Sequence, residues 1–404
     1  MAFNEAQKRA IRHTDGPALV LAGPGSGKTT VITNRVRYLT EKVGVEPGNI
    51  LVITFTRAAA REMKERYERI TGTGCSRVSF GTFHSVFFMI LKLAYRYQAS
   101  NIVKEEQRIQ FIREQLDHTD LEIEDEGEFI ASVLSEISLI KGELMSLDNY
   151  YAKSCSQTVF KELYEGYEGC LRKQGLLDFD DMLAMCYELF KERKDILLAW
   201  QRKYKYILID EFQDINRIQY EIIKMLALPE NNLFIVGDDD QSIYRFRGAR
   251  PELMLGFEKD YSDAERILLD VNYRCVDPVI ESAGKLIACN KTRFPKEIRG
   301  NRGKGCPVFI KEWPDPLTET KAITEELRDY HKMGIAYEDM TVLYRTNQGP
   351  RLLIERMMEY NIPFHMRDTV PNLYEHWISR NVFCYIYAAL GDLSRSNILQ
   401  IINR

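Results

Sequence analysis

The sequence predicts an α/β fold in which a parallel sheet is flanked by helices. Short apolar runs alternate along the chain with longer stretches of helical periodicity, as in successive βα units. The 404 residues allow two or three domains at a prior of about 150 residues each. Hydrophobic residues make up 45% and charged residues 28%, a balance typical of a globular protein with substantial cores.

Short apolar runs provide the candidate strands of this sheet. They are Ala18–Ala22, Ile50–Thr54, Ile207–Asp210, Leu233–Gly237 and Ile267–Leu269. The four runs up to Gly237 are each followed by small, polar or acidic residues. An open parallel sheet places its ligands beyond the carboxyl ends of its strands, so we expect a binding site there.

A long stretch with a different character interrupts these runs. Residues 87–203 have helical periodicity and many Glu and Lys residues. We interpret them as a helical subdomain inserted into a first α/β domain, which is then formed by residues 1–86 and 204–270. Within the insertion lies an acidic run that we interpret as a solvated surface. Its members are Glu122, Glu124, Asp125, Glu126 and Glu128.

A second, incomplete α/β domain is expected over residues 271–380, with strand-like Val308–Lys311 and Thr341–Tyr344. Residues 381–404 would then begin a further inserted helical subdomain. The last residues, 396–404, form an apolar periodic run without a glycine cap or a polar tail. We therefore expect the sequence to be cut rather than finished.

The formal net charge of −4 argues against a protein that coats nucleic acid by bulk electrostatics, although local basic grooves remain possible. One candidate groove is residues 285–304, which contain several Lys and Arg residues and only one acidic residue, Glu297. These cations could follow a DNA backbone or form an exposed basic face. Both interpretations stay open at this point.

Simple patterns in the sequence predict the cellular location of the protein and the state of its cysteines. No run reaches the ~20 apolar residues of a membrane span, and residues 1–5 do not resemble a secretory signal, so we expect a cytoplasmic protein without membrane contact. The eight cysteines include no Cys-x-x-Cys pair. We interpret them as buried or free thiols rather than metal ligands.

A glycine-rich run follows the first candidate strand. Its residues are Gly23-Pro24-Gly25-Ser26-Gly27-Lys28-Thr29-Thr30. The run fits a phosphate-binding P-loop, except that Ala22 stands at the first glycine position of the strict pattern. Small residues let successive N–H groups turn toward phosphates, and the following helix, expected over Val31–Leu39, adds its positive N-terminal end. We predict that Ala22 to Thr30 bind ATP; a plain glycine-rich turn is the structural alternative.

Two carboxylates follow another apolar strand. The run is Tyr206-Ile207-Leu208-Ile209-Asp210-Glu211. Lys28 would reach the β- and γ-phosphates, and Thr29 and Asp210 would ligate Mg²⁺. Glu211 stands where it can polarise the attacking water. An Asp-Glu pair on its own is often a surface feature, but this pair follows a buried type of strand in a chain with a P-loop.

These segments resemble the motifs of UvrD/Rep/PcrA-type superfamily 1 DNA helicases. The most specific matches are Asp210-Glu211-Phe212-Gln213-Asp214 (motif II) and Gly237-Asp238-Asp239-Asp240-Gln241-Ser242-Ile243-Tyr244-Arg245-Phe246-Arg247-Gly248-Ala249 (motif III). The others, in order, are Phe3–Gln7 (Q motif), Thr54–Ala59 (Ia), Gly81–Ser85 (Ib), Leu269–Arg274 (IV) and Val342–Asn347 (IVa). The resemblance implies a RecA-like P-loop sheet with an inserted helical subdomain, followed by part of a second RecA-like domain.

The resemblance also implies roles at the nucleotide. Gln7 would read the adenine edge, and Tyr273 would stack on the adenine ring. Gln241 would sense the γ-phosphate. Arg274 would act as an arginine finger that neutralises the charge developed during phosphoryl transfer. Without the resemblance, Gln7 and Tyr273 would be interpreted as surface or core residues.

Single strands are bound by aromatic faces together with cations and polar groups. By resemblance, residues of motifs Ia, Ib and III would contact single-stranded DNA and single-strand/double-strand junctions. They are Phe55, Arg57, Thr82, Phe83, His84, Tyr244, Phe246 and Arg247. The family commonly has Trp at the position of Phe246. Taken singly, such aromatics are more often core residues, and we hold Phe83 more loosely than the others.

Several departures limit what the resemblance implies. Motifs V and VI are missing, and with motif VI the second arginine that normally reaches the γ-phosphate; Thr30 stands where the family often has Arg. We expect the parent protein to be an ATP-dependent 3′→5′ DNA helicase in DNA repair or replication. The 404-residue chain alone should bind ATP and DNA but hydrolyse ATP poorly. Two alternatives are a helicase–nuclease subunit of AddA/RecB type and a protein that binds ATP and DNA without being a motor.

Overall fold

The computed structural model describes residues 3–72, 74, 76–117, 119, 121, 123, 125–245, 248–346, 349–367, 372, 374 and 377–402. The chain forms two compact units, residues 1–308 and residues 309–404. The domain limits inferred from the sequence remain predictions, and the limit at 86/87 falls inside a helix.

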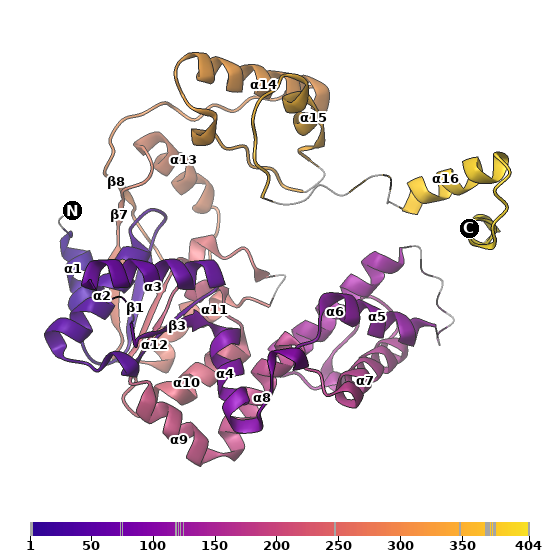
Figure 1. Ribbon diagram of the computed structural model, residues 1–404. Helices are drawn as coiled ribbons and strands as arrows, with labels where there is room; N and C mark the ends of the chain where they lie inside the picture. The colour runs from indigo at the N-terminus through magenta and orange to yellow at the C-terminus, as the bar shows by residue number, and fades with distance from the viewer. Residues whose placement is uncertain are drawn as a thin grey trace. The chain divides into compact units, whose positions relative to one another are not determined.

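A parallel sheet of 6 strands is the centre of the first unit (Figure 1). Its order is β3-β2-β4-β5-β1-β6, and every pairing is parallel. The strands are β1 Ala18–Ala22, β2 Ile50–Thr54, β3 Ser79–Thr82, β4 Tyr206–Ile209, β5 Leu233–Gly237 and β6 Glu265–Leu269. Two short strands, β7 Val271–Asn272 and β8 Arg299–Gly300, form a separate parallel pair.

The predicted strands agree closely with the observed ones. Three match to the residue, β4 begins and ends one residue earlier than expected, and β6 begins two residues earlier. The edge strand β3 was not predicted, because Ser79-Phe80-Gly81-Thr82 contains a glycine and two polar residues. Its pairing with β2 makes it a strand.

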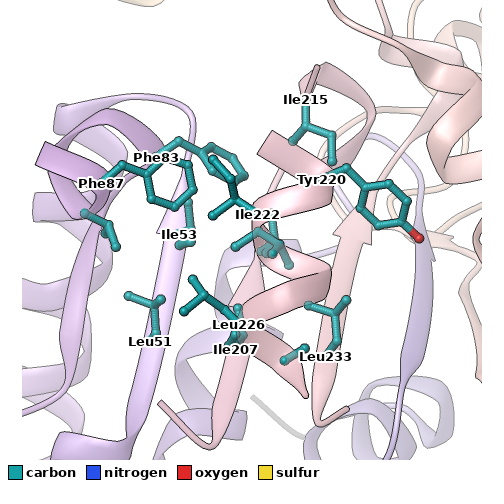
Figure 2. Close-up of a cluster of buried hydrophobic side chains, with 14 of the residues drawn as sticks. Leu51, Ile53, Phe83, Phe87, Ile207, Ile215, Tyr220, Ile222, Leu226 and Leu233 are labelled. Atoms are coloured by element: carbon teal, nitrogen blue, oxygen red, sulfur yellow. The ribbon is translucent and has the colours of Figure 1, made fainter. Parts of the chain in front are cut away.

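Helices cover both faces of the sheet. Leu51 and Ile53 belong to one hydrophobic core, while Ile50 and Val52 belong to the other, as expected when successive side chains point to opposite faces. Figure 2 shows the first core, in which Leu226 and other residues of the covering helices meet the strand residues. The helices of this unit that lie outside the insertion are α1 Glu5–Arg12, α2 Lys28–Tyr38, α3 Arg57–Thr71, α10 Arg217–Ala227, α11 Pro251–Leu255, α12 Phe257–Asp260 and α13 Asp277–Ile287.

The segment between β3 and β4 is helical, as predicted. It contains α4 Phe83–Tyr95, α5 Glu105–Leu116, α6 Glu126–Gly142, α7 Gln157–Gln174, α8 Phe179–Glu192 and α9 Lys194–Lys203. Residues of α5, α6 and α7 form a hydrophobic core of their own. Residues of α4, α8 and α9 instead belong to the core beneath the sheet. The insertion therefore has an outer part with its own core and an inner part that supports the sheet.

A buried ion cluster joins the helices of the insertion. The ammonium of Lys141 lies 2.6 Å from Glu168 Oε1, 2.8 Å from Asp178 Oδ2 and 2.7 Å from Asp181 Oδ1, and the Lys141 side chain is 5% exposed. Burial, reinforced by the charge of Asp178, raises the pKa of Asp181 to about 7 and that of Asp180 to about 6. With one ammonium group in contact with three carboxyl groups, Asp181 stays partly protonated near neutral pH.

The cluster predicts a dependence of stability on pH. The folded chain keeps a proton on Asp181 at pH values where the unfolded chain has lost it, so this carboxyl group stabilises the fold at low pH and its contribution is lost as pH rises toward 7. Asp181→Asn cannot titrate. Chemical denaturation should show that the unfolding free energy of the wild type, minus that of Asp181→Asn, falls by on the order of 2 kcal/mol from pH 5 to pH 8. A constant difference would show that Asp181 has no raised pKa.

The second unit contains helices α14 Pro316–Lys332, α15 Arg351–Glu359, α16 Trp377–Ala389 and α17 Arg395–Ile402. The strands expected at Val308–Lys311 and Thr341–Tyr344 are absent among the described residues, so that prediction was wrong. Most side chains in both segments are exposed, with Ile310 at 91% and Leu343 at 90%. A strand requires backbone partners on a neighbouring strand, and the described residues supply none to these segments.

Two further observations on the described residues concern membrane-spanning helices and the cysteine thiols. None of the described helices is long and apolar enough to cross a membrane. The seven described cysteines have free thiol groups.

Candidate nucleotide and nucleic-acid site

The predicted P-loop connects β1 to α2 at the carboxyl edge of the sheet. Gly25 and Gly27 have φ values of +66° and +87°, the left-handed region that favours glycine. A Cβ atom on Gly25 would lie 2.6 Å from Arg274 Cβ and 2.7 Å from Asn272 Oδ1. Gly27 is also the N-cap of α2 and has no side chain that could occupy the first amides of the helix. The loop therefore leaves the positive end of α2 open to an anion.

The remaining loop residues take defined positions. Ala22 ends β1, Pro24 is exposed, and Thr29 is half-buried in the first turn of α2. Ser26 is 2% exposed, and its hydroxyl has no hydrogen-bond partner within the described part of the chain. Thr30 Oγ1 accepts a hydrogen bond of 3.1 Å from Arg66 of α3. Arg66 thus places a guanidinium group beside the position where the family often has arginine.

The P-loop lysine meets the carboxylates that follow β4. Lys28 Nζ lies 2.7 Å from Glu211 Oε2, which also accepts a hydrogen bond of 2.9 Å from Gln213. Glu211 has a φ of +51°, a strained value for a residue with a side chain. The strained turn directs Glu211 toward the lysine, although β1 and β4 are separated in the sheet by β5.

Asp210 has the character of a cation ligand. It is 5% exposed, and its Oδ1 atom is buried without a hydrogen-bond partner among the described residues. Burial, followed by the charge of Glu211, raises the pKa of Asp210 to about 7. The same two causes raise the pKa of Asp214 to about 6. A buried carboxylate oxygen without a partner, beside further carboxyl groups, fits the oxygen ligands that Mg²⁺ prefers.

The two residues expected to contact the adenine base, Tyr273 and Gln7, lie together beside the P-loop. Tyr273 donates its backbone N–H to Gly25 O at 3.0 Å, and its hydroxyl accepts a bond of 3.0 Å from Asn4 Nδ2. Gln7 donates to Ser26 O at 3.0 Å, and its other amide end accepts from the backbone N–H of Asn4. Both ends of the Gln7 amide are thus engaged, and reading an adenine edge would require one of these bonds to open.

The remaining nucleotide candidates also lie close to the loop. The backbone of Arg274 faces Gly25, and its N–H donates to Asn272 Oδ1 at 2.8 Å. Gln241 ends the short helix η6 Asp239–Gln241 after β5, and its amide donates to Asp238 Oδ2 at 2.8 Å. The backbone of Arg274 therefore lies against the P-loop, and Gln241 is fixed to the loop that follows β5.

An aromatic pair stands at the ends of β2 and of the loop that follows β5. The rings of Phe55 and Tyr244 are stacked, with centroids 5.3 Å apart and planes at 21°. Phe55 is 36% exposed, and Tyr244 is half-buried. A half-exposed aromatic stack is the kind of surface on which nucleobases stack.

The other candidates for DNA contact have different surroundings. Arg57 begins α3 and is exposed, and His84 packs edge-on against Phe179. Burial and the positive charge of Arg57 lower the pKa of His84. Thr82 caps α4 with its hydroxyl group.

The position of Phe83 requires a correction. Its side chain is 3% exposed and packs against Phe87 in the core, so we remove it from the proposed DNA contacts. Phe246 and Arg247, also expected at the DNA, lie outside the described residues.

Two cations beside this site were missed by our interpretation of the sequence. Arg57 and Thr82 line an open cavity of about 480 Å³ together with Arg61 and Lys64 of α3. Residues 57, 61 and 64 follow helical spacing and so lie on one face of α3. That spacing was visible in the sequence and could have identified them. Glu65 and Glu68 also line the cavity, so its charge is mixed.

Comparison with known proteins places both units in one family. The UvrD/REP helicase N-terminal domain matches residues 3–262, and the UvrD-like helicase C-terminal domain matches residues 267–404. A protein of Bacillus subtilis (strain 168) named "Putative ATP-dependent DNA helicase YjcD" is 39% identical over 399 residues, which cover 97% of this chain and 52% of the relative. "ATP-dependent DNA helicase PcrA" of Staphylococcus aureus is 36% identical over 372 residues, which cover 90% of this chain and 50% of the relative. The chain thus spans about half the length of these relatives, and it belongs to the UvrD/Rep family of helicases.

Proposed function

We propose that the chain binds Mg·ATP between the P-loop and the carboxylates after β4. The observation that carries this proposal is the contact of 2.7 Å between Lys28 Nζ and Glu211 Oε2. It joins a phosphate-binding lysine to a carboxylate that can orient water. The relatives' names, which call them ATP-dependent helicases, support the same nucleotide.

Each residue has a separate task in this proposal. Lys28 exchanges Glu211 for the β- and γ-phosphates, and the released Glu211 accepts a proton from the attacking water. Thr29 and Asp210 would hold Mg²⁺, which neutralises phosphate charge when it is bound. Arg274 stabilises the negative charge that develops during transfer.

We propose single-stranded DNA, including the strand at a single-strand/double-strand junction, as the second ligand. The bases stack at the Phe55–Tyr244 pair, and the phosphates pass Arg57, Arg61 and Lys64. In the whole protein, closure and reopening of two motor domains would convert ATP hydrolysis into 3′→5′ movement and duplex unwinding. A DNA substrate fits a cytoplasmic location.

The DNA part of the proposal can be tested by removing the aromatic faces. Phe55→Ala and Tyr244→Ala should each weaken binding of a fluorescent oligodeoxythymidylate by about 5- to 150-fold, because stacking contributes about 1–3 kcal/mol per base. Nucleotide binding should stay within about 2-fold of the wild type. Leu93→Ala, at an exposed apolar residue of α4, serves as the matched control. Unchanged DNA affinity in both stacking variants would refute this path for the strand.

A further inference from the structure

An unusually dense ion cluster lies beside the nucleotide site. Asp238, Asp239 and Asp240 follow β5. Asp238 is the N-cap of the short helix η6, and the other two aspartates form that helix together with Gln241. Three successive carboxylates repel one another unless cations offset their charge. Asp238 is 0% exposed, so water cannot provide that compensation.

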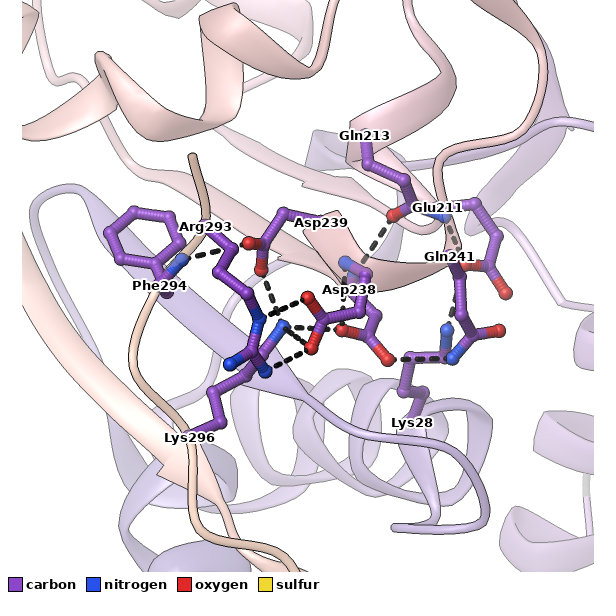
Figure 3. Close-up of polar contacts among 10 residues, drawn as sticks. Lys28, Glu211, Gln213, Asp238, Asp239, Gln241, Arg293, Phe294 and Lys296 are labelled. Carbon is purple, nitrogen blue, oxygen red and sulfur yellow. Dashed lines mark hydrogen bonds and ion pairs between the residues drawn. The ribbon is translucent and has the colours of Figure 1, made fainter. Parts of the chain in front are cut away.

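The cations come from the segment 293–299, between α13 and β8. Lys296 Nζ lies 2.5 Å from Asp238 Oδ1, 2.5 Å from Asp239 Oδ1 and 3.0 Å from Asp240 Oδ2, and the Lys296 side chain is 1% exposed. One ammonium group thus contacts all three aspartates (Figure 3). Its three N–H donors match three acceptors, which fixes the positions of all four groups.

Neighbouring residues of the same segment add to this contact. Arg293 donates two hydrogen bonds, of 2.7 Å and 2.6 Å, to the two oxygens of Asp240. The backbone N–H of Phe294 donates to Asp239 Oδ2 at 2.8 Å. Such paired, charge-assisted bonds restrain orientation as well as distance. The segment therefore holds η6 from several directions.

The other end of the segment lies on the P-loop. A Cβ atom on Gly23 would lie 2.7 Å from the side chain of Ile298, so the two are in close contact. Arg299 donates its backbone N–H to Asp270 O at 2.7 Å and forms an ion pair with the Asp270 side chain. The segment 293–299 thus touches the loops that follow β1, β5 and β6.

The aspartates connect this segment to the catalytic groups. Asp238 accepts a hydrogen bond from the Gln241 amide, and its backbone N–H donates to Gln213 Oε1 at 3.0 Å. Gln213 in turn donates to Glu211, the partner of Lys28. Continuous polar contacts therefore join Lys296 to Lys28, as Figure 3 shows. The same loop continues to Tyr244, which stacks on Phe55.

These contacts account for three of the seven cations of the basic stretch 285–304. Arg293, Lys296 and Arg299 are paired with aspartates of the chain itself, so they form neither a bare basic face nor a free DNA-binding surface. Simple charge compensation would not require one buried lysine to contact three successive residues. The arrangement instead fixes the backbone from which Gln241 and Tyr244 project.

We propose that Lys296, supported by Arg293, is a positioning residue that couples the nucleotide site to the DNA-binding pair. This inference rests on the proposed function of the two sites. Lys296 contacts all three aspartates, 238 to 240, and so fixes the loop that carries them. This fixed loop keeps Gln241 and Glu211 in one arrangement and keeps Tyr244 in a constant position relative to them. A change at the nucleotide then reaches the aromatic pair through a rigid loop rather than a loose one.

The test measures coupling between ligands on the 404-residue chain. The dissociation constant of a fluorescent, non-hydrolysable ATP analogue with Mg²⁺ is determined with and without saturating oligodeoxythymidylate, and the ratio is the coupling. Coupling between two sites is typically 5- to 150-fold. We expect a ratio of at least about 5 for the wild type and a ratio near 1 for Lys296→Met. Affinity for nucleotide without DNA should change by less than about 3-fold.

Further variants keep the test decisive if Lys296→Met folds poorly. Arg293→Gln, at a side chain that is 17% exposed, should lower the ratio at least 2-fold, and Lys296→Arg should restore part of it. Lys291→Met, at an exposed lysine of the same stretch, should leave it unchanged. Hydrogen exchange should quicken in residues 238–245 of the variants but not in β1.

The outcomes separate the two proposals. A wild-type chain that binds neither ligand would overturn the proposed function, and this inference with it. If the wild type binds both, the inference alone is overturned by a wild-type ratio of 1, or by an unchanged ratio in Lys296→Met and Arg293→Gln. It is overturned equally if these variants lose nucleotide affinity without DNA as strongly as with it, which would mark a purely structural role.

Discussion

Lys28→Ala is expected to weaken binding of Mg·ATP by about 100-fold. The lysine is the cation among Asp210, Glu211 and Asp214, and its side chain is 13% exposed. Removing it deletes charge-assisted contacts to phosphate worth about 1.5–3 kcal/mol. It also leaves carboxylates that repel the triphosphate, and each 1.4 kcal/mol corresponds to about tenfold in affinity. Titration with a fluorescent ATP analogue measures the effect.

Two variants control this result. Lys8→Ala removes a half-exposed lysine of α1 and should leave nucleotide affinity unchanged. Glu211→Gln removes a negative charge near the phosphates, and it should preserve or strengthen nucleotide binding while abolishing hydrolysis in the whole protein. If Lys28→Ala binds the analogue within about 3-fold of the wild type, Lys28 is not the phosphate-binding residue.

Lys141→Met is expected to destabilise the chain by about 3–5 kcal/mol. Methionine nearly preserves the volume of the side chain but removes the ammonium group from Glu168, Asp178 and Asp181. Breaking a buried ion pair from one side leaves uncompensated buried charge, which costs far more than the net worth of the pair. A shift of the denaturant midpoint at pH 7.5, with an unchanged slope, would report the loss.

An exposed pair provides the control for this prediction. Lys161→Met removes the ammonium group that lies 2.9 Å from Asp148 at the surface of the insertion. Water solvates both of those groups, so stability should hardly change. Adding Asp178→Asn and Asp181→Asn to Lys141→Met should recover part of the lost stability. Equal effects of Lys141→Met and Lys161→Met would contradict the role assigned to the buried cluster.

Local patterns made much of the geometry of the proposed nucleotide site predictable. Strand β1 and the small residues after it are adjacent in the sequence, so the P-loop and the position of Lys28 follow from one short run. Asp210 and Glu211 follow a strand of buried type. Because parallel strands end at one edge of the sheet, their approach to Lys28 could be expected before any distance was known.

The features that sequence did not predict depend on contacts between distant residues. Strand β3 exists because β2 lies beside it, and Val308–Lys311 is not a strand because no described neighbour pairs with it. An aromatic side chain in motif Ib can point to the core as easily as to solvent, and the Phe83 side chain points to the core. The pairing of Lys296 with Asp238 spans 58 positions, and no spacing rule connects such residues.

The central claim is that Lys28, Asp210 and Glu211 receive a magnesium triphosphate. A crystal structure of the chain with a non-hydrolysable ATP analogue and Mg²⁺ tests it most directly. We predict that Lys28 Nζ leaves Glu211 Oε2 for the β- and γ-phosphates, with the metal between the Thr29 hydroxyl and Asp210. A triphosphate bound elsewhere, or a Lys28 still paired with Glu211 beside the bound nucleotide, would contradict the claim.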